Sequence, residues 1–187
     1  TYIVDNTSDT VTESSGQGTD LIQSSVSYTA SNNVENLTLT GSGNINATGN
    51  TLNNTLTGNS GNNTLNGGSG GIDILYGYNG EDTLNGGNNN DYLYGGNGND
   101  TLNGGNHNDT LNGGSGNDIL NGGNNDDTLF GGFGNDQLTG GSGNNIFHIT
   151  TGYGRDLITD YTTSQDSLKI TGLSESNLTY SYSGGHT

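Results

Sequence analysis

Eight aspartates recur at steps of nine residues, and of all the residues in this sequence they are the best suited to chemistry. They are Asp73, Asp82, Asp91, Asp100, Asp109, Asp118, Asp127 and Asp136. Carboxylates are hard oxygen ligands, which suit Ca²⁺ with its six to eight flexible contacts at about 2.3 to 2.6 Å. Zn²⁺ prefers Cys or His, and the chain has no Cys, while Mg²⁺ prefers a smaller octahedral shell that keeps several waters. The spacing therefore predicts that the chain binds several calcium ions.

Each periodic Asp occupies the sixth place of a nine-residue phrase, GGxGxDxLx, with a Gly pair at the front and Leu at the eighth place. A period this short and regular predicts a repeat architecture. The last three residues are predicted to form a short strand and the six before them a turn, where paired glycines permit positive φ. Two strands then make one coil of eighteen residues. The coils are expected to stack in parallel as two sheets, with only the Leu of each repeat facing inward.

Coils of this length divide the aspartates into two rows with a spacing of about 4.8 Å. One row holds Asp73, Asp91, Asp109 and Asp127, and the other holds Asp82, Asp100, Asp118 and Asp136. Neighbouring carboxylates repel by about 1 kcal/mol in water and by about 4 kcal/mol at an effective dielectric near 20. A cation between successive turns reverses the sign of that interaction, so we predict two rows of calcium ions.

The fourth place of the phrase supports the eighteen-residue coil independently. Beside one row it is Gly80, Gly98, Gly116 and Gly134, and beside the other it is Asn89, His107 and Asn125. Asn tolerates the left-handed region, whereas His107 is a larger departure. A distorted turn at His107 would weaken the sites of its row. Tyr78, in a place where Gly is expected, raises the same question for the turn that holds Asp82.

Backbone carbonyls of the turns are expected to complete the calcium shells. The candidate glycines are Gly77, Gly86, Gly87, Gly95, Gly96, Gly98, Gly104, Gly105, Gly113, Gly114, Gly116, Gly122, Gly123, Gly131, Gly132 and Gly134. Asp156, in a GxGxD segment, is a further candidate ligand, ahead of Asp160 and Asp166. At both ends of the array Asn takes the sixth place, and we interpret these residues as uncharged versions of the same turn: Asn54, Asn63 and Asn145.

Composition limits the classes of partner. The formal net charge is −17, from 19 acidic and 2 basic residues, so nucleic acid and anionic membranes would be repelled. No apolar run reaches the roughly 20 residues needed to span a bilayer. Only 25% of the residues are hydrophobic and none is Cys, so bound metal is the expected source of the missing stability. Because the chain begins with Thr1, we expect it to be part of a longer protein.

The sequence does not predict an enzyme. The three histidines have no metal-type spacing, and no Ser, His and acid set is arranged for nucleophilic work; these histidines are His107, His148 and His186. A narrow roll filled with Leu also offers no concave pocket for a substrate. We therefore expect no catalytic residues in these 187 residues.

Three regions follow from the shifts in pattern. Residues 1–48 contain short β-branched runs and are expected to form strands continuous with the roll. Residues 49–148 carry the nine-residue phrases. Residues 149–187 lose the period and are interpreted as a cap over the last coil, as repeat proteins require.

The phrases GGNGNDTLN and GGSGNDILN resemble the RTX (repeats-in-toxin) nonapeptide GGxGxDxUx. The resemblance is strong from Gly67 to Phe147. It implies an all-β, right-handed parallel β-roll, export from bacteria by a type I system, and folding that waits for extracellular calcium. A secreted or cell-surface location follows from the same resemblance.

Two other functions fit the sequence. A regular polar turn face, made by Asn88, Asn90, Asn106, Asn108, Asn124 and Asp126, could meet ice, a polysaccharide or a cell surface, as in an adhesin. Alternatively, the chain is the accessory domain of a secreted protease, lipase or epimerase whose catalytic part lies elsewhere.

Overall fold

The computed structural model describes residues 1–172, and these residues form strands and turns without a helix. The larger sheet has ten parallel strands: β1 (Tyr2–Val4), β2 (Leu21–Ser24), β4 (Asn36–Leu39), β6 (Thr55–Thr57), β8 (Ile74–Asn79), β10 (Tyr92–Asn97), β12 (Thr110–Ser115), β14 (Thr128–Phe133), β16 (Ile146–Thr150) and β18 (Ser167–Thr171). The smaller sheet has eight: β3 (Tyr28–Thr29), β5 (Ala47–Thr48), β7 (Thr64–Asn66), β9 (Thr83–Asn88), β11 (Thr101–Asn106), β13 (Ile119–Asn124), β15 (Gln137–Ser142) and β17 (Leu157–Ile158).

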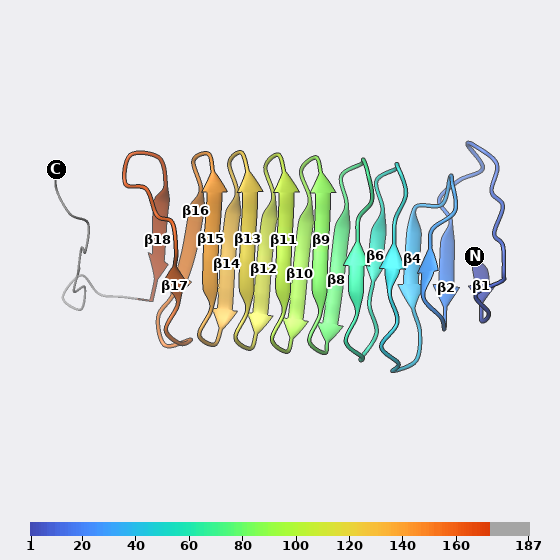
Figure 1. Cartoon of the computed structure of the whole chain (residues 1–187), viewed down its shortest axis with the longest axis horizontal. Coiled ribbons are helices and arrows are strands. Elements are labelled where there is room, and N and C mark those ends of the chain that lie inside the picture. The colour runs from blue at the N-terminus through green and yellow to red at the C-terminus, as the bar shows by residue number, and fades with distance from the viewer. Residues whose placement is uncertain (173–187) are drawn as a thin grey trace.

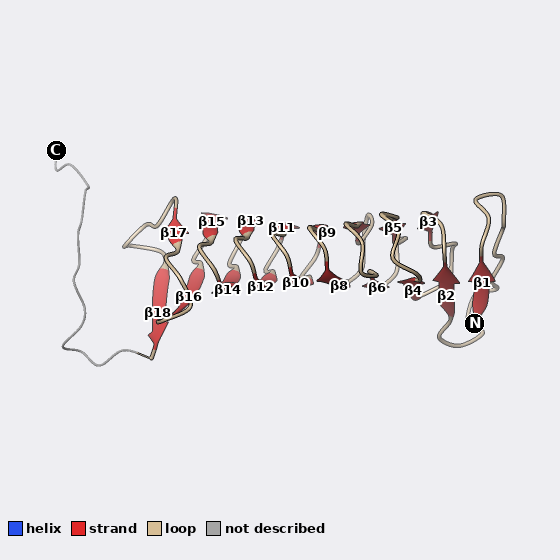
Figure 2. Cartoon of the chain, turned by 90° about the horizontal axis from the view of Figure 1, so that it is seen from below, coloured by secondary structure: helices blue, strands red, loops and turns tan. Residues whose placement is uncertain are grey.

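From β2 onward the chain alternates between the two sheets and makes a solenoid of about nine coils. Each of these strands pairs in parallel with the strand two elements away, and β1 pairs in parallel with β2. Figure 1 shows the strands lying across the long axis of an elongated body, with the strands of one sheet pointing opposite to those of the other. Figure 2 shows the sheets as two facing layers. The predicted all-β parallel roll is therefore confirmed; its right-handed sense stays a prediction.

In the coils that carry the periodic aspartates, the register of both sheets has the predicted step of eighteen residues. Leu93 pairs with Leu111 in the larger sheet, and Leu102 pairs with Leu120 in the smaller one. The repeat leucines form a fully buried ladder between the sheets: Leu56, Leu65, Leu75, Leu84, Leu93, Leu102, Leu111, Leu120, Leu129 and Leu138. Phe147 extends the ladder, as its position in the phrase predicts.

The strands are longer than predicted. In the regular coils each strand has six residues, as in β11, and contains the Gly pair of the following phrase. Only the second Gly of a pair has positive φ; Gly105 has φ 113°, whereas Gly104 does not lie in that region. The first Gly lies inside the strand, and the pairing resumes at the second Gly, where Gly105 pairs with Gly123, so the turn shrinks to the places that follow. The predicted division into three strand residues and six turn residues is therefore wrong.

Two side chains of each repeat face inward, not one. The periodic Asp and the Leu two residues later are both buried, as Asp109 and Leu111 illustrate. Side chains alternate across a strand, so residues two apart share a face. The expectation that only Leu faces inward is wrong for this reason, and the core contains carboxylates as well as leucines.

Residues at both ends continue the same sheets. Strands β1 to β5 precede the repeats in the sheet order, and β16 to β18 follow them. The division at residues 48 and 148 stays a prediction, and residues 173–187 of the proposed cap lie outside the described part. The described residues include no helix long and apolar enough to cross a membrane.

Candidate calcium sites

The eight periodic aspartates lie in two rows inside the solenoid, with exposed fractions of only 1–2%. In each row a carboxylate accepts a hydrogen bond from the backbone of the Asp one coil earlier. The Asp91 N–H donates to Oδ1 of Asp109 at 2.7 Å, and the Asp109 N–H donates to Oδ1 of Asp127 at 2.8 Å. The other row repeats this pattern from Asp82 to Asp136. The structure thus brings together the two sets of aspartates predicted from the eighteen-residue step.

The second carboxylate oxygen of every one of these aspartates is buried and has no hydrogen-bond partner in the part of the chain that the structure describes. This holds for Oδ2 of Asp73, Asp82, Asp91, Asp100, Asp109, Asp118, Asp127 and Asp136. A buried polar atom without a partner is costly, and a buried charge more so. Eight such acceptors in regular rows require either protons or cations.

Burial disfavours the charged form of these carboxyls. It raises the pKa of Asp109 to about 8, against the lowering effect of the hydrogen bond from Asp91, and the charges of Asp127 and Asp91 add to the rise. Burial likewise raises the pKa of Asp91, Asp118 and Asp127 to about 7, and that of Asp73, Asp82, Asp100 and Asp136 to about 6. A bound cation would oppose this shift, because it favours the ionised carboxylate.

The first Gly of each pair provides the space for the carboxylate. A Cβ atom on Gly104 would lie 2.5 Å from Oδ2 of Asp109 and 2.6 Å from the carbonyl oxygen of Gly122, one coil later. Both oxygens therefore face the same small space beside Gly104. The same arrangement of Oδ2 and carbonyl recurs at Gly77, Gly86, Gly95, Gly113 and Gly122.

The remaining predicted glycines have other surroundings. At Gly131 the nearest atoms belong to Asp136 alone. The second glycines have positive φ, and a Cβ on them would overlap a carbonyl of the preceding coil; these are Gly87, Gly96, Gly105, Gly114, Gly123 and Gly132. A Cβ atom would likewise overlap a carbonyl of the preceding coil at the glycines of the fourth place, Gly98, Gly116 and Gly134.

The donor set suits calcium and not a transition metal. Among the described residues, no three His, Cys, Asp or Glu side chains gather at one point. A site in either row would instead combine Oδ2 atoms with backbone carbonyl oxygens. An all-oxygen shell of carboxylates and carbonyls is the kind that Ca²⁺ accepts. The ligand roles of the individual Asp and Gly residues stay predictions.

The two rows have different turns, as the fourth place predicts. Gly98 and Gly116 have φ 131° and 133°, whereas Asn89, His107 and Asn125 have φ 75–78°. His107 matches its Asn neighbours, and its Nδ1 accepts a hydrogen bond from the Asn89 N–H at 3.3 Å. The His107 turn is therefore not distorted relative to its row. Tyr78 also has φ 75°, and its ring is 54% exposed and stacks on Tyr76.

The C-terminal acids differ in what they can bind. Asp156 continues one row, because its Oδ1 accepts from the Asp136 N–H at 3.2 Å. Asp166 continues the other row, after Asn145, because its Oδ1 accepts a hydrogen bond from the Asn145 N–H at 2.9 Å. Its second oxygen, Oδ2, already accepts a hydrogen bond from the Thr162 N–H. Both oxygens of Asp160 accept backbone N–H groups, from Gly140 and Gly141. The irregular spacing after residue 148 conceals that Asp166 belongs to a row.

The polar turn face is an amide ladder. Asn106 donates from Nδ2 to Oδ1 of Asn88 at 2.8 Å, and Asn124 donates to Asn106 at 2.7 Å. These amide groups therefore bond to one another along the solenoid.

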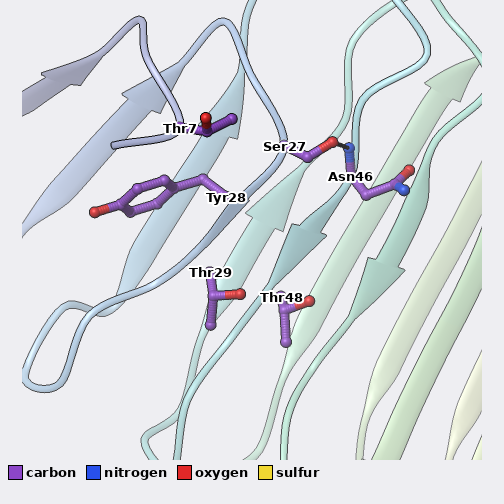
Figure 3. A pocket seen from close by; sticks show the side chains of 6 residues that line it. All are labelled: Thr7, Ser27, Tyr28, Thr29, Asn46 and Thr48. Carbon is purple, nitrogen blue, oxygen red and sulfur yellow. Dashed lines mark hydrogen bonds between the residues drawn. The ribbon is translucent and has the colours of Figure 1, made fainter. Parts of the chain in front are cut away.

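One hollow of the described part lies near the N-terminal end of the smaller sheet. The hollow beside β3 and β5 is lined by Thr7, Ser27, Tyr28, Thr29, Asn46 and Thr48, which Figure 3 shows on neighbouring segments. These six residues include no carboxylate, imidazole or thiol. His148 stacks on Phe130, and His186 lies outside the described residues.

A parallel two-sheet solenoid with rows of buried carboxylates and glycine turns defines the class of calcium-binding β-rolls. The family model of the RTX calcium-binding nonapeptide repeat matches residues 48–71, 68–102, 85–120, 103–138, 113–147 and 121–156. These segments together cover residues 48–156, more than half of the chain, so the chain belongs to this family. The predicted RTX resemblance is confirmed. No curated protein sequence matches the chain.

Proposed function

We propose that the two rows of aspartates bind calcium ions between successive turns, and that this binding folds the roll. One observation carries the proposal: eight buried Oδ2 atoms have no hydrogen-bond donor within the described residues 1–172. A cation in each row would supply the missing partner and remove the repulsion between stacked carboxylates.

Calcium, when bound, supplies concentrated positive charge that the chain lacks. The residues of each turn position the oxygen atoms that would bind it. Oδ1 of Asp109 is fixed by the Asp91 N–H, which leaves Oδ2 directed beside Gly104, where the Gly122 carbonyl also lies. Because the carboxylates of one row belong to successive coils, an ion between them joins those coils. Binding free energy therefore becomes folding free energy.

Folding by calcium binding also explains why the core contains so few apolar side chains. Each regular repeat buries one Leu and one Asp, which is little apolar area to offset the loss of chain entropy. In the absence of calcium the aspartates at pH 7 add a further cost. We expect the coils that carry the aspartates to be unfolded where calcium is scarce and folded where it is plentiful.

The proposed setting is a larger bacterial protein that is secreted or displayed on the cell surface, with the roll as a structural part and not as an enzyme. Family membership supports this setting, because RTX repeats are typical of secreted bacterial proteins. Binding of ice or polysaccharide by the amide ladder, and attachment to a catalytic domain, stay predictions.

Circular dichroism of the chain during a calcium titration tests the proposal. We expect most of the β signal to be missing in excess chelator, a cooperative gain of β structure as calcium is added, and a much weaker response to magnesium. A complete β spectrum that persists in chelator would show that calcium does not fold the roll.

A further inference from the structure

The first two turns of the repeat region differ in two places from the turns that carry the periodic aspartates. The turn 49–54 has Asn50 at the second place and Asn54 at the sixth, and the turn 58–63 has Asn59 and Asn63. Later turns have Gly or Tyr at the second place and, up to residue 136, Asp at the sixth.

In the turn 49–54 every side-chain amide group has a partner. Asn50 donates from Nδ2 to the carbonyl oxygens of Ser31 and Val34, both at 2.8 Å, and its Oδ1 accepts from the Leu52 N–H. Asn54 donates from Nδ2 to the Val34 and Glu35 carbonyls at 3.0 and 3.2 Å, and its Oδ1 accepts from the Asn50 N–H. The two amides thus bond this turn to the coil before it.

The turn 58–63 repeats the arrangement on the other side of the solenoid. Asn59 is 8% exposed and donates from Nδ2 to the carbonyls of Thr40 and Gly43, at 3.3 and 3.0 Å. Asn63 donates from Nδ2 to the Ile45 carbonyl at 2.7 Å, and its Oδ1 accepts from the Asn59 N–H at 2.8 Å. This turn also leaves no buried side-chain polar atom unpaired.

The later turns contrast at the same two places. Where Gly104 and Gly105 precede Asp109, the second place has no side chain that could bond the carbonyls of the preceding coil, and Oδ2 of Asp109 has no donor among the described residues. Asn145 shows that an amide at the sixth place is insufficient alone. It follows Gly140 and Gly141, and its Nδ2 is buried without a partner. The complete network needs Asn at both places.

We propose that the amides of Asn50, Asn54, Asn59 and Asn63 replace calcium in the first two turns. Their N–H groups bond the carbonyls of the preceding coil, as a cation would, without adding charge. The segment from β4 to β7 then stays folded without calcium. This inference rests on the proposed function, because a substitute for calcium has meaning only if the later turns use the ion.

The calcium-independent segment also presents the next coil with a prepared edge. The Asn54 N–H donates to Oδ1 of Asp73, and the Asn63 N–H donates to Oδ1 of Asp82, both at 2.7 Å. These are the first aspartates of the two rows. Each row therefore starts from a donor that is in place before calcium arrives, so the aspartate coils add onto a formed template.

Hydrogen exchange of the full chain in excess chelator tests this directly. We expect amides of residues 36–66 to exchange at least about tenfold more slowly than an unstructured chain, while residues 83–139 become protected only with calcium. Fast exchange at 36–66 in chelator, with calcium-dependent protection at 83–139 intact, would overturn the inference and leave the proposed function standing. Protection of 83–139 in chelator would instead contradict the proposed function.

A matched pair of glycine variants isolates the amide. Asn59→Gly gives the second place of this turn the glycine that the later turns have there. Ser60→Gly adds a glycine to the same turn at an exposed position. In chelator we expect Asn59→Gly to lose at least about tenfold in protection across 36–66, and Ser60→Gly to lose much less. Equal effects of the two variants would mean that turn flexibility, and not the amide network, sets the protection.

A gain of calcium binding completes the test. The double variant Asn59→Gly with Asn63→Asp converts the turn 58–63 to the later type. We expect native mass spectrometry in calcium to show additional bound calcium relative to the parent chain, and protection of 36–66 to become calcium-dependent. An unchanged calcium count together with undiminished protection in chelator would overturn the inference.

Discussion

Oδ2 of Asp109 lies 2.5 Å from the point where a Cβ atom would stand on Gly104. Gly104 does not have positive φ, so its backbone would accept any residue. Glycine is required there for space, because the carboxylate of its own turn and the Gly122 carbonyl occupy the volume of a methyl group. The Gly pair thus serves two purposes: the first residue makes room for the ligand oxygens, and the second turns the chain.

Gly104→Ala is therefore expected to lower the free energy of unfolding in calcium by about 2 kcal/mol, in the range for overpacking a rigid site. The Gly122 carbonyl belongs to a paired strand and cannot move away freely. Urea unfolding measures the change. Gly43→Ala is the control, since its added Cβ meets nothing within 4 Å and its φ is not positive. If both variants lose the same stability, the crowding at Gly104 is not the cause.

Asp109→Asn should weaken calcium-driven folding while preserving the shape of the turn. The amide keeps an acceptor for the Asp91 N–H but removes a charge, and the affinity of oxygen sites follows ligand charge. We expect the calcium concentration at the folding midpoint to rise by at least about threefold. The control Asp126→Asn removes an equal charge from an exposed position and should leave the midpoint nearly unchanged. Comparable shifts in both would point to net charge alone.

The buried aspartates predict opposite pH effects with and without calcium. Their folded-state pKa values of about 6 to 8 lie above the ordinary value of 3.8. At pH values between these limits, the folded chain therefore binds more protons than the unfolded chain. Without metal, stability must then fall as the pH rises through this range. Circular dichroism in chelator should show β structure increasing toward pH 4 and lost by about pH 8. In a calcium titration, acid should raise the folding midpoint, because protons compete for the same oxygens; a midpoint independent of pH would contradict the carboxylate sites.

His107→Gly is expected to stabilise the roll. His107 has φ 78°, where a non-glycine residue costs about 1 kcal/mol, and the bond it accepts from Asn89 is exposed and long at 3.3 Å. We expect a gain of about 0.5 to 1 kcal/mol in unfolding free energy with calcium. Asn125→Gly, at φ 78° in the same row, should gain less because Asn tolerates this region. A loss of stability in His107→Gly would show that the His107 side chain stabilises its turn.

Much of the architecture could be predicted from the period. The Leu ladder, the two sheets and the two aspartate rows follow from a nine-residue step and a two-strand coil, and the structure confirms them in the pairing of Leu93 with Leu111 and in the Asp91 to Asp109 hydrogen bond. The strand length could not be predicted in this way. Gly was assigned to turns by its conformational preference, yet Gly104 lies inside β11, where glycine is needed because a Cβ atom would collide with the carboxylate of Asp109.

The sequence by itself determined the repeat, which aspartates make up each row, and the preference for a hard cation with oxygen ligands. Residue type and spacing are local properties. Only the tertiary structure decided that the aspartates are buried, that each keeps one oxygen free while the preceding coil fixes the other, and that Asn50 and Asn59 bond carbonyls of the preceding coil. Burial and pairing depend on residues about eighteen positions apart. Those contacts exist only once the coils have stacked.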